Sequence, residues 1–284
     1  MLLLLACTGP RLLLDPDPTR DGLGGGDGPF GAAAVERRYT ARVTDTVPTT
    51  VVYPADAAGQ PVGEGHPVLV FVHGGFVAPD RYAWLWAHFA SRGVVVAAPT
   101  SPLRLAITEP GNASAALDGL LADSGPQALW PGLVSTTTPA VVGGHSLGGV
   151  VSALVWADDD RFDGLFLAAS FPADGTVARS GTHALALVGT EDGASPPADV
   201  QAGVAPLGAP VGLVDGLTHY GWTDGASARD EAGDGVATRP VDEARRDLLA
   251  VLDRWVDAVF AEDDATIAAL PLEDHAGVTF GEAE

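Results

Sequence analysis

Short apolar segments alternate with longer segments of helical periodicity along most of the chain. Six short apolar runs predict buried strands: Val68–Val72, Val94–Ala98, Ala140–Val142, Leu165–Ala168, Ala184–Val188 and Val211–Val214. Four further segments predict helices: Tyr82–Ser91, Ala113–Ala122, Gly149–Ala157 and Val241–Phe260. Uniformly apolar strands that alternate with helices are typical of a parallel sheet covered on both faces. The pattern therefore predicts an α/β fold with a mostly parallel central sheet flanked by helices.

The segments at either end of this pattern differ from it in composition. Arg37–Val43 and Thr49–Tyr53 predict an antiparallel hairpin that opens the domain. Residues 8–35 are rich in glycine, proline and aspartate and predict a flexible linker, because such a stretch buries little apolar area. A phosphate-binding loop is the other interpretation of its glycines, but no strand precedes them and no lysine follows them. Residues 36–262 then form one domain, and the acidic residues 263–284 form a loosely packed tail.

The chain is strongly acidic. It has 37 aspartates and glutamates against 15 arginines and no lysine, which gives a formal net charge of −22. Such a surface repels the phosphates of nucleic acids and anionic lipids, so we expect no nucleic-acid partner. Adaptation to salt and a GC-rich genome each account for this composition. We expect the protein to be a monomer.

The N-terminus carries the only cysteine of the chain, Cys7, so neither an intrachain disulfide nor a cysteine-based zinc site can form. The apolar run Leu2–Leu5 with Ala6 and Cys7 resembles the lipobox of bacterial lipoproteins, in which the cysteine is lipidated. The run lacks a basic segment before it and is too short to span a membrane. We expect residues 1–7 to be a signal segment, and the protein to be exported, either as a surface lipoprotein tethered through Cys7 or in secreted form. The alternative is an incidental N-terminus without a signal.

The segment Gly144–Gly148 carries the strongest chemical signal, a G-x-S-x-G motif with Ser146 at its centre. A predicted strand precedes the motif and a predicted helix follows it, which is the setting of a nucleophile elbow. Such a turn holds the serine in a strained backbone conformation, and the glycines on either side prevent collisions with neighbouring strands. The serine hydroxyl then projects near the positive end of the helix. An ordinary tight turn is the alternative reading.

A serine nucleophile needs a base, and in hydrolases built on such an elbow the order along the chain is serine, acid, histidine. Three histidines follow Ser146. His183 stands at the wrong end of a predicted strand and His275 lies in the acidic tail. His219 follows the predicted strand Val211–Val214 in a loop, so we expect it to be the base.

The acid that orients this base should follow the strand Ala184–Val188 at its carboxyl end. Glu191 and Asp192 both lie there, and the spacing Gly189 to Asp192 favours Asp192. Asp215 is a weaker rival, because it ends a different strand only four residues before His219. The oxyanion hole needs two donors: one is the backbone N–H of Leu147, and the other comes from the turn His73–Phe76. We expect His73 itself to be structural.

Residues 36–262 resemble the α/β-hydrolase superfamily, and within it the dienelactone-hydrolase-like and cutinase-like group, which includes bacterial polyester hydrolases and acetylhydrolases of the platelet-activating-factor type. The similar stretches are Phe71–Phe76, Ala83–Leu85, Ala90–Val96, Gly144–Gly149 and Gly189–Asp192. The resemblance implies that the amide of Phe76 is the second oxyanion donor and that Phe171 is an aromatic substrate clamp. The chain departs from polyester hydrolases at Leu147, where methionine is usual, and in lacking a late disulfide.

Cap domains of this superfamily usually follow the strand that is here Leu165–Ala168. Only 15 residues, 169–183, separate it from the next strand, too few for a lid of several helices. We therefore expect an open cleft, with substrate contacts from Gly75, Phe76, Phe171, Tyr220 and Trp222. Core packing is the alternative for each of these aromatic side chains.

These observations predict a serine ester hydrolase that works through an acyl-serine, with Ser146, His219 and Asp192 as its triad. It would need no metal or organic cofactor and would act on short-to-medium acyl esters or on polyesters. Two alternatives stay open: a non-catalytic surface lipoprotein that binds through this fold, and an acyltransferase with the same triad.

Overall fold

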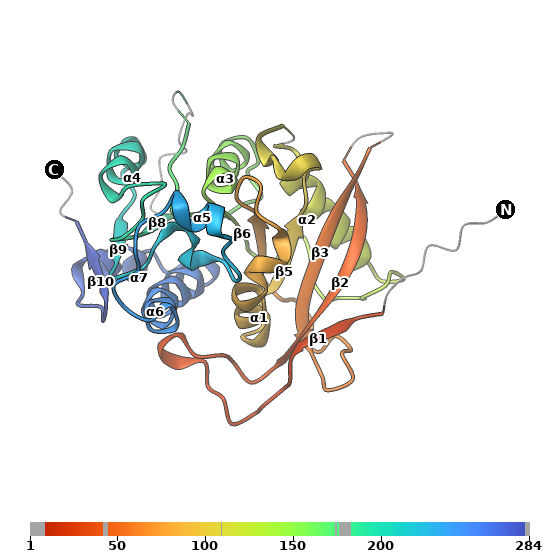
Figure 1. Ribbon diagram of the computed structural model, residues 1–284. Coiled ribbons are helices and arrows are strands. Elements are labelled where there is room, and N and C mark those ends of the chain that lie inside the picture. Colours follow the sequence, from red (N-terminus) through yellow and green to blue (C-terminus); the bar gives the residue numbers. More distant parts are fainter. Residues whose placement is uncertain (1–8, 42–44, 109, 174, 176–182, 282–284) are drawn as a thin grey trace.

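The computed structural model describes residues 9–41, 45–108, 110–173, 175 and 183–281, which build one twisted sheet with helices on both faces (Figure 1). Cys7 and its predicted lipidation lie outside these residues. The described strands are β1 (Arg11–Leu14), β2 (Gly31–Thr40), β3 (Thr46–Ala55), β4 (Val68–Val72), β5 (Val95–Pro99), β6 (Ala140–His145), β7 (Gly164–Ala168), β8 (Ala184–Gly189), β9 (Val211–Val214) and β10 (Val278–Phe280). The described α-helices are α1 (Ala83–Ser91), α2 (Asn112–Asp123), α3 (Leu147–Asp158), α4 (Pro197–Val204), α5 (Ala228–Ala232), α6 (Val241–Phe260) and α7 (Asp264–Ala269).

The strand order in the described part of the chain is β1-β2-β3-β5-β4-β6-β7-β8-β9-β10. Strands β4 to β9 run parallel to one another, whereas β1, β2 and β3 at one edge and β10 at the other pair antiparallel with their neighbours. The carboxyl ends of the parallel strands therefore share one edge, and ligand sites of α/β sheets lie there. The predicted mostly parallel sheet is confirmed.

Each central strand divides its side chains between two cores. In β4, Leu69 and Phe71 pack with α1 and α6, whereas Val68, Val70 and Val72 pack with α2, α3 and α4 on the other face. Successive side chains of a strand point to opposite faces, so a strand covered on both sides must be apolar throughout. This is why the apolar runs predicted these strands well.

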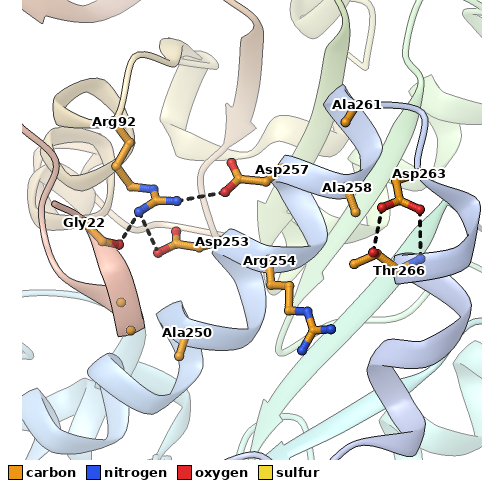
Figure 2. Close-up of a pocket in the computed structure, with 12 residues that line it drawn as sticks. Gly22, Arg92, Ala250, Asp253, Arg254, Asp257, Ala258, Ala261, Asp263 and Thr266 are labelled. Carbon is orange, nitrogen blue, oxygen red and sulfur yellow. Dashed lines mark hydrogen bonds and ion pairs between the residues drawn. The ribbon is translucent and has the colours of Figure 1, made fainter.

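The predicted flexible linker is wrong for the described residues 9–35. Leu12 and Leu14 belong to β1, which pairs antiparallel with β2, and Leu14 packs against the core. Figure 2 shows Arg92, just past α1, contacting the carbonyl oxygen of Gly22 and forming an ion pair with Asp257 of α6 (2.9 Å). The segment folds onto the domain because its glycines let the backbone approach α1 and α6 closely.

Gly28 allows us to test this packing. Its N–H donates to Ser91 Oγ (2.9 Å), and a Cβ atom added there would lie 2.4 Å from the Ser91 carbonyl oxygen. Gly28→Ala should therefore destabilise the fold by about 1–3 kcal/mol through overpacking and lower Tm by several degrees. Gly9→Ala is the matched control, since a Cβ atom there meets no heavy atom within 4 Å. Equal melting temperatures for both variants, measured by circular dichroism, would contradict the packed segment.

The predicted loose tail is also wrong as far as Gly281. Strand β10 extends the sheet by pairing with β9, Val278 opposite Val214. Before it, α7 buries Ile267, and Leu270 just past the helix is buried as well. These apolar side chains stand three residues apart, so they share one helix face while the acidic residues face water. The tail was predicted to be loosely packed because its acidic composition outweighs these few apolar residues. No helix in the described ranges is both long and apolar enough to cross a bilayer.

Candidate active site

Ser146 occupies a sharp turn between β6 and α3, with φ 54° and ψ −125°. A Cβ atom at Gly148 would lie 2.1 Å from the Val72 carbonyl oxygen, and one at Gly144 would lie 2.5 Å from the Gly148 backbone. Both glycines are thus required for the turn to fit between its neighbours. The turn is fixed by the Ser146 N–H, which donates to the Ala168 carbonyl (2.9 Å). A strained serine on an over-determined turn is typical of a nucleophile elbow.

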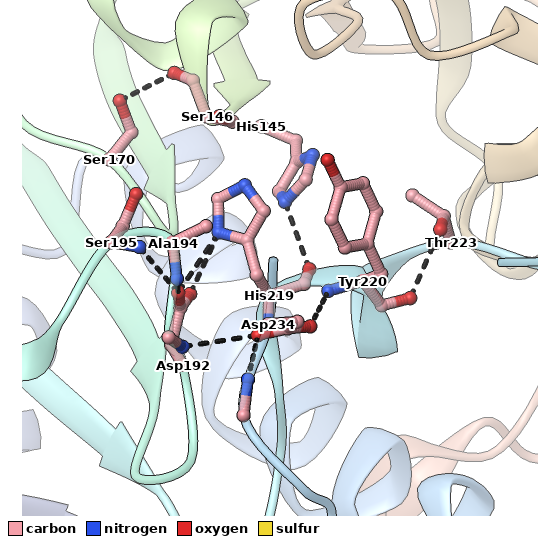
Figure 3. A network of polar contacts seen from close by, with 12 residues as sticks. His145, Ser146, Ser170, Asp192, Ala194, Ser195, His219, Tyr220, Thr223 and Asp234 are labelled. Atoms are coloured by element: carbon pink, nitrogen blue, oxygen red, sulfur yellow. Dashed lines mark hydrogen bonds and ion pairs between the residues drawn. The ribbon is translucent and has the colours of Figure 1, made fainter. Parts of the chain in front are cut away.

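His219 and Asp192 form a buried pair beside this turn. Nδ1 of His219 lies 2.9 and 3.1 Å from the two carboxylate oxygens of Asp192, and the side chain of Asp192 is fully buried. Asp192 also accepts hydrogen bonds from the amides of Ala194 (3.0 Å) and Ser195 (2.6 Å). In Figure 3 the imidazole lies between the carboxylate and Ser146. A carboxylate that accepts the Nδ1 hydrogen leaves Nε2 unprotonated and able to take a proton.

The rival acids and bases lie elsewhere. Asp215 is mostly exposed and forms an ion pair with Arg239 (3.7 Å). Glu191 faces Thr190 and Thr238, each 3.4 Å from its carboxylate.

The other two histidines that follow Ser146 lie close to helix α7. His183 pairs with Asp264 (2.8 Å), and His275 Nε2 contacts the Leu270 carbonyl (2.7 Å). Among the candidates considered, Asp192 and His219 are therefore the ones brought together beside Ser146.

Residues 68–245 match the model of the Alpha/beta hydrolase family. The chain belongs to the alpha/beta hydrolase family. No curated protein matches the chain. The matched segment includes Ser146, Asp192 and His219, so the geometry above lies within the part of the chain that the family model describes. Within the described residues, no three His, Cys, Asp or Glu side chains are grouped as metal ligands.

The two predicted oxyanion donors of this alpha/beta hydrolase, the amides of Leu147 and Phe76, differ in their hydrogen bonding. The amide of Leu147 opens α3, where helix geometry provides no intrahelical acceptor. The amide of Phe76, however, donates to the carbonyl oxygen of Arg104 (2.8 Å). The Phe76 amide is therefore occupied in this conformation, and its predicted role as the second oxyanion donor stays a prediction. Leu103 and Arg104 both have positive φ, 54° and 56°. These two backbone conformations bring the carbonyl oxygen of Arg104 to the Phe76 amide.

The predicted substrate contacts divide into two groups. Phe76 is 70% exposed, a Cβ atom at Gly75 would lie 3.3 Å from the Leu147 side chain, and Tyr220 is half-buried with its ring edge-on to His219. Trp222, by contrast, is fully buried and packs on Phe166.

The short 3₁₀ helix His219–Trp222 turns this indole into the core, so the predicted cleft contact at Trp222 is wrong. Phe171 is half-buried, and its ring lies against Gly203 of α4, where an added Cβ atom would be 2.5 Å away. Its predicted role as a clamp stays a prediction.

His145, the residue before the serine, is a feature that sequence reasoning did not use. Its Nδ1 lies 2.9 Å from Tyr82 Oη and its Nε2 lies 3.1 Å from the carbonyl oxygen of His219. Tyr82 Oη accepts the amide hydrogen of Gly74 (3.0 Å), so its own hydrogen goes to His145 Nδ1, and Nε2–H donates to His219. Complete burial, with His219 beside it, holds the pKa of His145 well below its ordinary value. The ring is therefore a neutral link between the Gly74 turn and the His219 loop.

Proposed function

We propose that this alpha/beta hydrolase is a serine esterase that cleaves carboxylic esters through an acyl-serine. The observation that carries the proposal is the buried Asp192–His219 pair beside the strained Ser146 turn. Such a pair supplies what a serine hydroxyl lacks, a base held in the correct tautomer by a buried carboxylate.

In the proposed reaction, Ser146 Oγ attacks the ester carbonyl carbon while Nε2 of His219 takes the hydroxyl proton. The resulting oxyanion accepts a hydrogen bond from the Leu147 amide. The intermediate collapses, the C–O bond to the alcohol breaks, and His219 returns the proton to the departing alkoxide. Water then attacks the acyl-serine with His219 again as the base, which releases the acid and restores Ser146.

The second oxyanion donor requires a local rearrangement. The Phe76 amide can bind the oxyanion only when the Arg104 carbonyl gives it up. We therefore propose that the turn at Leu103 and Arg104 shifts when an ester enters. Two consecutive positive φ angles at residues other than glycine favour such a shift, because each costs about 1–3 kcal/mol of strain.

For the substrate, we propose the class suggested by the resemblance to cutinase-like and dienelactone-hydrolase-like enzymes. The described residues between β7 and β8 contain no helix, and Phe76 presents an exposed ring beside the site. We propose an open groove at this site, because a groove with aromatic edges accepts flexible acyl chains and aromatic groups.

An open groove predicts the response to chain length. In a panel of p-nitrophenyl esters, kcat/KM should be greatest for short-to-medium acyl chains, about C2 to C8, because a shallow groove buries few methylenes. Rates should saturate smoothly with substrate, since nothing has to open at a lipid interface. A strong preference for long-chain triglyceride, with a jump in rate at the emulsion threshold, would contradict the open groove. Release of products from an aromatic polyester film would support the narrower polyester assignment.

A further inference from the structure

Asp234 lies between α5 and α6, and its carboxylate accepts four backbone amides (Figure 3). Oδ1 accepts from Gly193 (3.1 Å), His219 (3.0 Å) and Gly235 (2.8 Å), and Oδ2 accepts from Tyr220 (2.8 Å). Gly193 belongs to the loop after β8, and His219 and Tyr220 belong to the loop after β9. One carboxylate thus joins the loop of the proposed acid to the loop of the proposed base.

The backbone around Asp234 fits closely against the acid loop. A Cβ atom at Gly193 would lie 2.6 Å from the nitrogen of Gly235, and one at Gly235 would lie 1.9 Å from the carbonyl oxygen of Glu191. Neither position has room for a side chain. The two glycines therefore let the 233–235 segment approach closely enough for the Asp234 carboxylate to reach both loops.

The charge state of Asp234 suits its four donors. Burial by itself raises the pKa of this carboxyl, but the backbone hydrogen bonds from Tyr220, Gly193, His219 and Gly235 outweigh burial and hold the pKa below its ordinary value. The ionised group has acceptors only. An asparagine would have the same shape but would turn an NH₂ group toward at least one of these amides.

We infer that Asp234 is a positioning residue, which holds the loops of Asp192 and His219 in register so that the two side chains stay within hydrogen-bond distance. The inference rests on the proposed function. Asp234 touches the backbone of both loops and acts through them on the imidazole. Its loss should therefore displace the base from the serine more than it changes substrate binding.

The test compares Asp234→Asn with Asp230→Asn. Asp230 is a nearby carboxylate on α5 that pairs with Arg81 (3.0 Å) and accepts from the Ser227 amide (2.9 Å). Asp234→Asn should lower kcat for a soluble p-nitrophenyl ester about 10- to 100-fold, the cost of a misplaced catalytic group, with KM changed less than about two-fold. Asp230→Asn should leave kcat within about two-fold of wild type.

A proton NMR spectrum provides a readout that does not depend on turnover. The Nδ1 hydrogen of His219, held by Asp192, should give a downfield resonance that disappears in His219→Ala. In Asp234→Asn this resonance should shift or broaden, whereas in Asp230→Asn it should not. This result stands even if wild-type protein hydrolyses no ester, so the inference and the proposed function fail separately.

An unchanged kcat and an unchanged resonance in folded Asp234→Asn would overturn the inference, and so would equal losses in the two variants. If Asp234→Asn does not fold, Asp234→Glu decides the question, because it keeps both acceptor oxygens but moves them by one methylene. We expect a folded glutamate variant with a lower kcat and a shifted resonance. A lower Tm with wild-type kcat and resonance would show that the carboxylate stabilises the loops without positioning the pair.

Discussion

Replacing Ser146 with alanine is expected to remove essentially all ester hydrolysis while the protein stays folded. The change deletes the attacking oxygen and leaves His219 and Asp192 in place, so kcat should fall by roughly a million-fold, to the residual rate that binding and oxyanion donors provide. Stability should change little, because alanine takes the same strained backbone position as the serine. The measurements are kcat/KM on a p-nitrophenyl ester and Tm by circular dichroism.

Ser170→Ala is the matched control for this variant. Ser170 Oγ donates to the Ser146 carbonyl oxygen (2.7 Å), so this serine supports the same turn without reaching the proposed reaction. Its loss removes one hydrogen bond, about 0.5–1.5 kcal/mol, and should cost no more than about ten-fold in kcat. Folded Ser146→Ala protein with wild-type turnover would exclude Ser146 as the nucleophile.

Asp192→Asn should be the most severe of the carboxylate changes considered, with a loss of about ten-thousand-fold in kcat. The carboxylate accepts from Nδ1 of His219 and from two amides. An asparagine NH₂ facing the imidazole would favour the tautomer with its hydrogen on Nε2, which cannot take the serine proton. The rate loss should therefore appear in kcat at neutral pH, with little change in Tm.

Glu191→Gln and Asp215→Asn are the controls for the choice of acid. Both carboxylates lie near the same edge of the sheet, but Asp215 pairs with Arg239, and Glu191 faces two threonine hydroxyls. Each control should retain activity within a few-fold of wild type. A larger loss in Asp215→Asn than in Asp192→Asn would show that the acid has been assigned to the wrong loop.

The central sheet could be predicted from the sequence because its strands are apolar on both faces. The predicted and observed bounds agree for β4, β9 and α6. They differ by one residue at one end for β7 and β8, and by one residue at each end for β5. The predictions of a flexible linker and a loose tail failed because they rested on composition alone. Glycines in residues 9–35 permit close packing, and the acidic residues 262–264, 273 and 274 flank the narrow apolar face of Ile267 and Leu270.

The pairing of Asp192 with His219 could be predicted from motif and chain order, whereas the surroundings of the pair could not. The groups that donate to Asp234 are backbone amides, which nearly every residue carries, so no sequence pattern predicts them. The occupied Phe76 amide depends on positive φ at Leu103 and Arg104, which side-chain identity does not encode. Trp222 points inward because of the 3₁₀ turn that begins at His219.

Fluorophosphonate labelling followed by peptide mapping tests the central claim most directly, because a phosphonyl adduct forms only on an activated nucleophile. The account predicts one adduct per chain, on Ser146, with none on Ser146→Ala and a much slower reaction in His219→Ala. Rapid ester hydrolysis by a protein that is labelled at another residue, or at none, would contradict it.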